Sequence, residues 1–98
     1  MGIRLELTHE ARADLMEIWR YIAEDDKQVA SKFLDRLYVE CEKLASLGSV
    51  GRSRTELGGG VLSYFFKRYV IFFTRDAKRL TVLRVLHGAR DQSKVFDN

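Results

Sequence analysis

The last third of the chain, residues 62–91, limits the possible folds most strongly. It reads LSYFF, then RYVIFFTRD, then RLTVLRVLHGARD, with arginine or lysine at nearly every strand end. Apolar runs rich in Val, Ile, Phe and Tyr and separated by short turns are typical of strands. A sheet this apolar needs cover on at least one face. The sequence therefore predicts a small fold with one buried sheet face and a charged rim for an anionic or acidic partner.

The first half of the chain predicts one strand and two helices. Residues 3–7 alternate between apolar and charged side chains, which is the period of a half-buried strand. Thr8 is a suitable N-cap for a helix that runs to about residue 24, and Asp25 and Asp26 separate it from a second helix over residues 27–47. The apolar positions of the two helices repeat at three and four residues, and they are Ala11, Leu15, Ile18 and Ile22, then Ala30, Phe33, Leu34, Leu37, Cys41 and Leu44.

The second helix has a wider apolar surface than a single contact requires. Val29, Tyr38 and Ala45 lie beside its main stripe. These residues either fill the contact between the two helices or form a groove for a helix of a partner. On the first helix, Trp19 and Tyr21 are expected in the core between helices and sheet.

The second half of the chain predicts a loop and three strands. Residues 49–60 contain four glycines, so we expect a loop there. Strands are expected at residues 61–66, 68–75 and 80–87, joined by short turns that make both pairs antiparallel. The order β-α-α-β-β-β predicts an α+β fold in which a helical hairpin packs on an antiparallel-rich sheet. With 98 residues, the chain is expected to form one domain over residues 1–98.

Charge is unevenly distributed along the chain. The formal net charge is +3, yet residues 1–48 hold seven Lys or Arg and ten Asp or Glu, whereas residues 49–98 hold ten and four. The basic half is either an ordinary solvated surface or a surface for an acidic partner or a phosphate backbone. Cys41 has no second cysteine to pair with, and no apolar run suggests a leader or a membrane span. We therefore expect a cytoplasmic protein with no membrane partner.

Few residues are arranged for chemistry. Cys41, His9 and His87 lack the spacing of metal ligands, and the glycines at residues 58–60 precede a strand rather than open a helix, as a phosphate-binding loop would. We therefore expect no metal and no cofactor. A reaction would have to use His87, the tyrosines and the basic residues.

Four segments resemble the RelE/ParE superfamily of bacterial toxins, and most of all its ParE branch. ARADLMEIWRYIA at residues 11–23 is similar to the first helix of that family, and GRSRTEL at residues 51–57 to its glycine-arginine loop. RYVIFFTR at residues 68–75 and VLRVLHGARD at residues 82–91 resemble its last two strands. The turn at residues 65–68 lacks the proline and glycine that are usual in ParE-like sequences, so we expect its shape to differ.

The resemblance implies the toxin of a type II toxin–antitoxin system, with roles in growth arrest and plasmid stabilization. A ParE-type toxin poisons DNA gyrase by binding and is neutralised by a ParD-like antitoxin, whose C-terminal segment wraps the toxin and through which the complex binds operator DNA. The expected target-binding residues are Arg84, His87, Arg90, Asp91 and Phe96. The expected antitoxin-binding residues are Phe33, Leu37, Tyr38, Arg52 and Arg68. Arg90 and Asp91 form either part of the target surface or a local ion pair.

Two other functions are compatible with the sequence. RelE-type relatives cleave messenger RNA on the ribosome, which here would leave His87 to move protons and Arg84, Arg68 and Arg52 to bind phosphate. The tail over residues 91–98 has neither tyrosine nor histidine, which favours the ParE interpretation. A histidine at a strand end more often hydrogen-bonds the backbone of the following loop. The remaining possibility is an inactive toxin that only binds antitoxin.

Overall fold

The computed structural model describes residues 3–48, 50–89 and 96 of the chain. Its elements are β1 (Arg4–Leu7), α1 (His9–Ala23), α2 (Lys27–Ser46), β2 (Arg52–Ser53), the 3₁₀ helix η1 (Thr55–Leu57), β3 (Leu62–Phe66), β4 (Tyr69–Arg75) and β5 (Arg79–His87). The predicted β-α-α-β-β-β order is confirmed, with element bounds that differ by about a residue. The exceptions are β2 and η1, which lie within the segment predicted as a loop.

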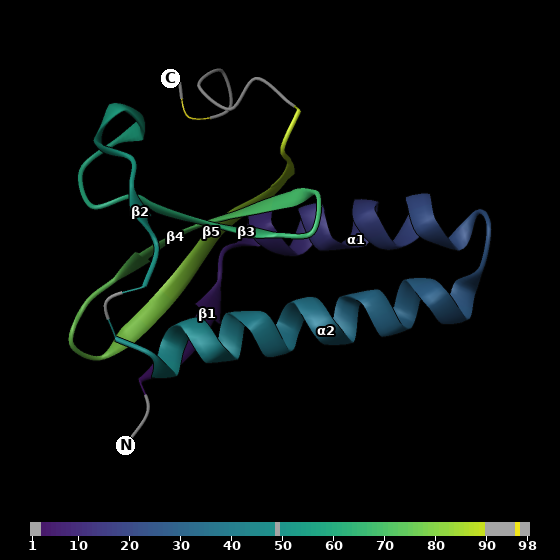
Figure 1. Cartoon of the computed structure of the whole chain (residues 1–98), viewed down its shortest axis with the longest axis horizontal. Coiled ribbons are helices and arrows are strands. Elements are labelled where there is room, and N and C mark those ends of the chain that lie inside the picture. Colours follow the sequence, from purple (N-terminus) through teal and green to yellow (C-terminus); the bar gives the residue numbers. More distant parts are fainter. Residues whose placement is uncertain (1–2, 49, 90–95, 97–98) are drawn as a thin grey trace.

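The strands form one sheet in the order β1-β5-β4-β3-β2. β1 runs parallel to β5, whereas the other three neighbouring pairs are antiparallel. α1 and α2 lie side by side as a hairpin packed on the sheet, and the end that joins them projects beyond the strands (Figure 1). The predicted layer of a helical hairpin on a largely antiparallel sheet is therefore confirmed.

Both helices begin at the side-chain caps that the sequence predicts. The Oγ1 atom of Thr8 accepts a hydrogen bond from the N–H of Ala11 at 3.0 Å, and Oδ1 of Asp26 accepts one from the N–H of Gln28 at 2.9 Å. At the other end of α2, Arg75 donates to the carbonyl of Leu44, which places a cation where the helix dipole is negative. In the described part of the chain, no helix combines the length and the apolar character needed to cross a membrane.

β4 is buried on both of its faces. Ile71 and Phe73 belong to a cluster between the sheet and the helices, and Val70 and Phe72 belong to a second cluster on the other face. The second cluster also contains Val61 and Leu86, with Leu57, Leu83 and Phe96 packed against it. This alternation explains why the sequence of β4 is apolar at consecutive positions rather than at every second one.

One expectation about the core is wrong. Tyr21 was expected between helices and sheet, but it is 73% exposed and lies near the C-terminal end of α1. Trp19 is half-buried, and its Nε1–H donates to Oγ of Ser31 at 3.2 Å, which joins the two helices. Val29 and Tyr38 are exposed, so the extra apolar residues of α2 do not all fill the contact between the helices.

The turn between β3 and β4 is a tight one built without proline or glycine. Phe66 pairs with Tyr69, which leaves only Lys67 and Arg68 in the loop. Lys67 has a φ of 57°, a left-handed conformation that tight hairpins usually assign to glycine. Such a conformation costs about 1–2 kcal/mol for a residue with a side chain. The hairpin therefore tolerates local strain at a position where no glycine is present.

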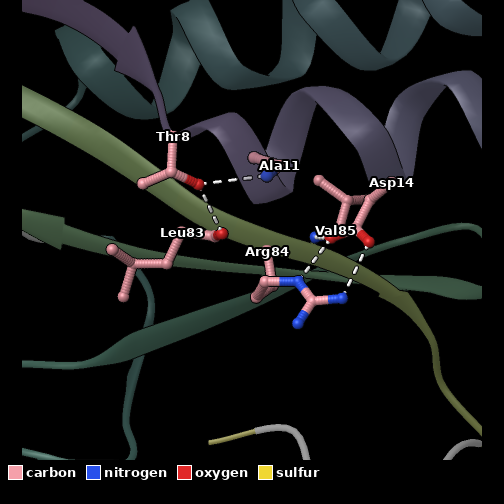
Figure 2. Close-up of polar contacts among 6 residues, drawn as sticks. All are labelled: Thr8, Ala11, Asp14, Leu83, Arg84 and Val85. Atoms are coloured by element: carbon pink, nitrogen blue, oxygen red, sulfur yellow. Dashed lines mark hydrogen bonds and ion pairs between the residues drawn. The ribbon is translucent and has the colours of Figure 1, made fainter.

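β1 is shorter than β5, so part of the edge of β5 has no neighbouring strand among the described residues. The ladder between them ends where Leu7 pairs with Val82. Immediately afterwards, the N–H of Thr8 donates to the carbonyl of Val82 at 3.0 Å, and its hydroxyl donates to the carbonyl of Leu83 at 2.7 Å (Figure 2). Thr8 thus continues the ladder by one residue while it also caps α1.

Asp14 continues the same edge from the helix. Its side chain is buried, and Oδ2 accepts a hydrogen bond from the N–H of Val85 at 2.9 Å. The same carboxylate accepts two bonds from Arg84, from Nε at 2.7 Å and from Nη2 at 2.9 Å (Figure 2). A carboxylate of α1 therefore takes the place of a strand as the hydrogen-bond partner of β5.

Asp14→Ala is expected to lower the free energy of unfolding by about 2–4 kcal/mol, because it leaves the N–H of Val85 without an acceptor and Arg84 without its counter-charge. Asp14→Asn keeps one acceptor and should cost less. Asp35→Ala is the matched control, since Asp35 is an exposed aspartate on the other helix. Urea denaturation of the three variants measures the difference, and equal stability of Asp14→Ala and Asp35→Ala would contradict this role.

Gly51 precedes β2 and lies against the core. Its φ is 113°, and a Cβ atom at this position would lie 2.7 Å from Cζ of Phe73. Gly51→Ala is therefore expected to destabilise the protein by about 2–4 kcal/mol through backbone strain and overpacking. A Cβ atom at Gly59 would meet nothing within 4 Å, so Gly59→Ala should leave the unfolding midpoint nearly unchanged. Thermal or chemical unfolding of both variants checks the contrast.

Candidate functional site

Arg84 lies at the open edge of β5 and is held there by a carboxylate. Its two hydrogen bonds to Asp14 form a bidentate ion pair, a strong geometry for arginine. These bonds, with the negative charges of Asp14, Glu10 and Glu17, raise the pKa of the Arg84 guanidinium above its ordinary value. The sequence assigns the positive charge of Arg84 to a target or a phosphate. In the structure, the carboxylate of Asp14 largely balances that charge.

His87 ends β5 and also makes a local contact. Its Nδ1 accepts a hydrogen bond from the N–H of Ala89 at 3.2 Å, and its ring meets that of Tyr69 edge to face at a centroid distance of 5.6 Å. An Nδ1 that accepts places the proton of a neutral imidazole on Nε2. This contact matches the alternative in which the histidine orders the loop after the strand.

The other expected target-binding residues do not join this edge. Phe96 lies in the second cluster, where its ring meets that of Phe72 at a centroid distance of 5.1 Å. Phe72 of β4 pairs with Arg84 of β5 in the sheet. Phe96 therefore lies over β4, the strand next to the one that carries Arg84. Arg90 and Asp91 lie outside the described residues.

The expected antitoxin-binding residues differ in accessibility. Leu37 is only 1% exposed and belongs to the core, so a partner cannot reach it without moving α2. Phe33 is half-buried, with its ring 5.7 Å from Phe66 and 5.6 Å from Tyr69 between centroids. The surface-exposed members of this set are Tyr38 on α2, Arg52 on β2 and Arg68 in the β3–β4 turn.

A groove lies between α1 and the open edge of β5, and we call it the α1–β5 groove. It has a volume of about 330 Å³. Its walls come from three elements, and the lining residues are Asp14, Glu17, Ile18 and Tyr21 of α1, Tyr69 of β4, and Val85, Leu86 and His87 of β5. The groove thus combines an apolar floor with carboxylates, phenol rings and an imidazole.

Of the residues in this groove, the sequence singled out His87 by number, and the tyrosines only as a class. One signal for Asp14 was nevertheless present. Asp14 stands three residues after Ala11 and four before Ile18, so it lies on the apolar face of α1. A carboxylate on a buried helix face requires hydrogen-bond donors, and Arg84 and Val85 supply them. That the donors would come from β5 depends on the crossing of α1 over the sheet, which no local pattern encodes.

A second groove, of about 290 Å³, lies between α2 and β3. It is lined by Asp35, Arg36, Val39, Glu40, Lys43 and Phe66. Glu40 is already paired, since its Oε1 accepts from the hydroxyl of Tyr64 at 3.0 Å and its Oε2 lies 3.6 Å from Nζ of Lys43. Charges of both signs therefore border the exposed Val39.

Potential metal ligands do not gather in the described residues, and the Cys41 thiol is buried. The described residues contain no group of three or more His, Cys, Asp or Glu side chains that could hold a metal ion. Burial, together with the negative charges of Glu40 and Glu42, raises the pKa of the Cys41 thiol to about 12. Cys41 is therefore protonated at neutral pH, and it acts as a small apolar residue of the core.

Comparison with known proteins agrees with this architecture. The model of a family described as ParE toxin of type II toxin-antitoxin system, parDE, matches residues 5–92. Toxin ParE3 of Caulobacter vibrioides is 26% identical over 86 residues, which cover 87% of this chain and 86% of that protein.

Two solved structures share the fold. The chromosomal ParDE toxin–antitoxin system of P. aeruginosa contains a chain that matches with a TM-score of 0.73 and 21% identity, covering 88% of this chain and 96% of that one. A chain of the RelBE2 toxin–antitoxin complex of Mycobacterium tuberculosis matches with a TM-score of 0.61 and 20% identity, covering 89% and 99%. The family match over most of the chain, on a helical hairpin packed against a five-stranded sheet, shows that this protein belongs to the ParE family, the toxins of type II toxin–antitoxin systems.

Proposed function

We propose that this toxin arrests growth by binding and poisoning DNA gyrase in the cytoplasm, and that a ParD-like antitoxin neutralises it. The observation that carries the proposal is that the two residues best suited to RNA cleavage already have structural partners. Arg84 is bound to Asp14, and Nδ1 of His87 is bound to the backbone of Ala89. A ribonuclease would need a proton carrier and cations directed at a phosphate. Binding without covalent chemistry fits the arrangement better.

The surface offered to gyrase is positive without Arg84. Arg52 on β2 and Arg68 in the β3–β4 turn, the expected antitoxin contacts, are exposed together with Lys67 of the same turn, so in this proposal the antitoxin and gyrase compete for them. Phe65, on β3 next to that turn, is 65% exposed, which adds an aromatic side chain to the same region. Exposed arginine and aromatic residues are the types most often enriched where proteins bind tightly. Long-range attraction between this surface and the gyrase–DNA complex would speed the encounter.

The antitoxin is expected to cover apolar residues that the toxin leaves exposed. On α2 these are Val29, Tyr38 and Val39, and the half-buried Phe33 lies on the same helix. Val29 and Phe33 are one turn apart and share a side of the helix, so an amphipathic segment of the antitoxin along that side would bury these two, while Tyr38 and Val39 lie elsewhere around α2. In this proposal the antitoxin also makes the contacts with operator DNA, so the toxin takes part in transcriptional regulation only as a member of the complex.

Purified toxin added to gyrase, ATP and supercoiled plasmid is expected to accumulate linear DNA once the protein is denatured and digested, because a poison traps the enzyme on cut DNA. Toxin that has been mixed with its antitoxin beforehand is the control and should leave the plasmid supercoiled. Agarose gel electrophoresis gives the readout. Intact plasmid together with cleaved transcripts on ribosomes would contradict the proposal.

His87→Ala is expected to keep its toxicity. A nuclease that moved protons with this imidazole would lose about 10²–10⁴-fold in rate, whereas a binding toxin loses only a ring contact with Tyr69 and a loop hydrogen bond. Colony counts after induced expression measure toxicity, and circular dichroism confirms that the variant is folded. Because His87 is also an expected target-binding residue, loss of toxicity favours the nuclease only if the folded variant also loses the ability to cleave transcripts on ribosomes.

A further inference from the structure

Two arginines of neighbouring strands lie directly opposite each other at the start of the parallel ladder. Arg4 of β1 pairs with Arg79 of β5, and the next pair, Leu5 with Leu80, packs in the cluster between sheet and helices. Successive side chains of a strand alternate in direction, so both arginines project from the face of the sheet opposite the helical hairpin. Like charges directly opposite each other in a sheet are destabilising. The stability of the fold therefore gives no reason for this pair.

One carboxylate serves both arginines. Oε1 of Glu6 lies 3.3 Å from Nη1 of Arg79, and its Oε2 lies 3.6 Å from Nη1 of Arg4. The side chains of Arg4 and Arg79 are nevertheless 72% and 46% exposed. A guanidinium carries five N–H donors, so Glu6 holds the two groups side by side and leaves most of their donors directed at solvent.

A third cation lies in the turn between β4 and β5. Lys78 is exposed and makes no ion pair with a described residue, and its carbonyl accepts a hydrogen bond from the N–H of Arg4 at 2.9 Å. Asp76 of the same turn directs Oδ1 at the backbone, where it accepts from the N–H of Lys78 at 2.8 Å and from that of Arg79 at 2.9 Å. Ile3, Arg4, Lys78 and Arg79 line a hollow of about 560 Å³, which we call the β1–β5 hollow.

The lining of the β1–β5 hollow suits phosphate groups. Guanidinium and ammonium groups bind phosphate oxygens through charge-assisted hydrogen bonds. The core of a protein interface is apolar, whereas Ile3, the one apolar residue of this lining, packs against the core of the toxin itself. Single-stranded nucleic acids bind on aromatic side chains that stack with their bases, and the lining has none. A duplex, which presents phosphates outside and stacked bases inside, is the ligand that fits these cations.

The β1–β5 hollow lies apart from the surface proposed for gyrase. Lys67 and Arg68 precede β4, whereas Lys78 and Arg79 follow it, so the two groups lie at opposite ends of that strand. A strand of this length spans roughly 20 Å. A protein bound at one end of β4 therefore leaves the other end accessible to DNA.

We propose that Arg4, Lys78 and Arg79 of the β1–β5 hollow bind the phosphate backbone of duplex DNA. Contacts with phosphates carry no sequence information, so recognition of the operator stays with the antitoxin. The inference goes beyond the proposed function, because it gives the toxin a direct contact with DNA that requires neither gyrase nor antitoxin. On gyrase, the same contact would add to the attraction between the toxin and the DNA that the enzyme holds.

The test measures binding of the purified full-length toxin to a short labelled DNA duplex of arbitrary sequence by fluorescence anisotropy. Affinity is expected to fall as salt rises, because bound phosphates release counterions. Arg4→Ala combined with Lys78→Ala should weaken binding at low salt about tenfold and lower the slope of log Kd against log salt by about 2. Lys27→Ala combined with Lys32→Ala removes the same charge from exposed lysines of α2. This matched control should keep the wild-type affinity and slope.

Glu6→Gln is expected to act in the opposite direction. It removes the carboxylate that competes with phosphate for Arg4 and Arg79, so binding of the duplex should tighten about three- to fivefold. A substitution that merely loosened the fold would weaken binding, so tighter binding separates the electrostatic role from a structural one.

The DNA site is overturned if the duplex does not bind, if binding is insensitive to salt, or if the Arg4 and Lys78 double variant binds like the lysine control. Tighter binding of the single strand than of the duplex would also overturn it. The gyrase assay tests the other level. A double variant that no longer binds free DNA but still accumulates linear plasmid with gyrase leaves the proposed function intact. Wild-type toxin that binds the duplex and leaves gyrase unaffected would refute the proposed function and keep the DNA site.

Discussion

The carboxylate of Asp14 joins the two layers of this toxin at the place where its sheet loses a strand. β1 covers β5 only as far as Val82, and the next edge groups are satisfied by the Thr8 hydroxyl and by Asp14. A buried backbone N–H without a partner costs about 1–3 kcal/mol. The position of α1, the orientation of Arg84 and the shape of the groove beside them all follow from this one replacement of a strand by a side chain.

The ion pair with Asp14 distinguishes Arg84 from the exposed basic residues of the second half of the chain. Arg84 is positive but already bound, so it stabilises the structure and adds little to the field that a partner meets. Arg52, Lys67 and Arg68 are exposed, so they shape the surface potential around β2 and the β3–β4 turn. A count of basic residues in the second half of the chain does not make this distinction. Two carboxylates, Asp14 and Glu17, line the α1–β5 groove in a protein whose formal net charge is +3.

Local sequence patterns were sufficient for most of the fold. The apolar period of α1 and α2, their caps at Thr8 and Asp26, and the apolar run of β4 each depend on neighbours in sequence. The sheet order was beyond such patterns, since the parallel pairing of β1 with β5 joins residues more than seventy positions apart. Tyr21 was misplaced for a related reason: whether an aromatic residue of α1 enters the core or lines an open groove depends on how the helix packs against β4 and β5.

The candidate site was less predictable than the fold. His87 and Arg84 stand out in the sequence because of their chemistry, yet their roles depend on the bonds they make with Ala89 and Asp14. Leu37 was expected at a partner surface because it is apolar and helical, whereas the packing of α2 on the sheet buries it. Glu17 has no distinctive sequence context. Only the tertiary structure brings Glu17 beside the edge of β5, in the lining of the α1–β5 groove.

The pairing of β1 with β5 has a consequence for the way the chain is made. The hydroxyl of Thr8 binds the carbonyl of Leu83, 75 positions later, and β4 can bury its two faces only when segments from both ends of the molecule are present. Contacts of such separation form late, because the intervening chain must first be ordered. The ribosome must therefore release the chain at least as far as Leu83 before the sheet that supports the helical hairpin can be completed.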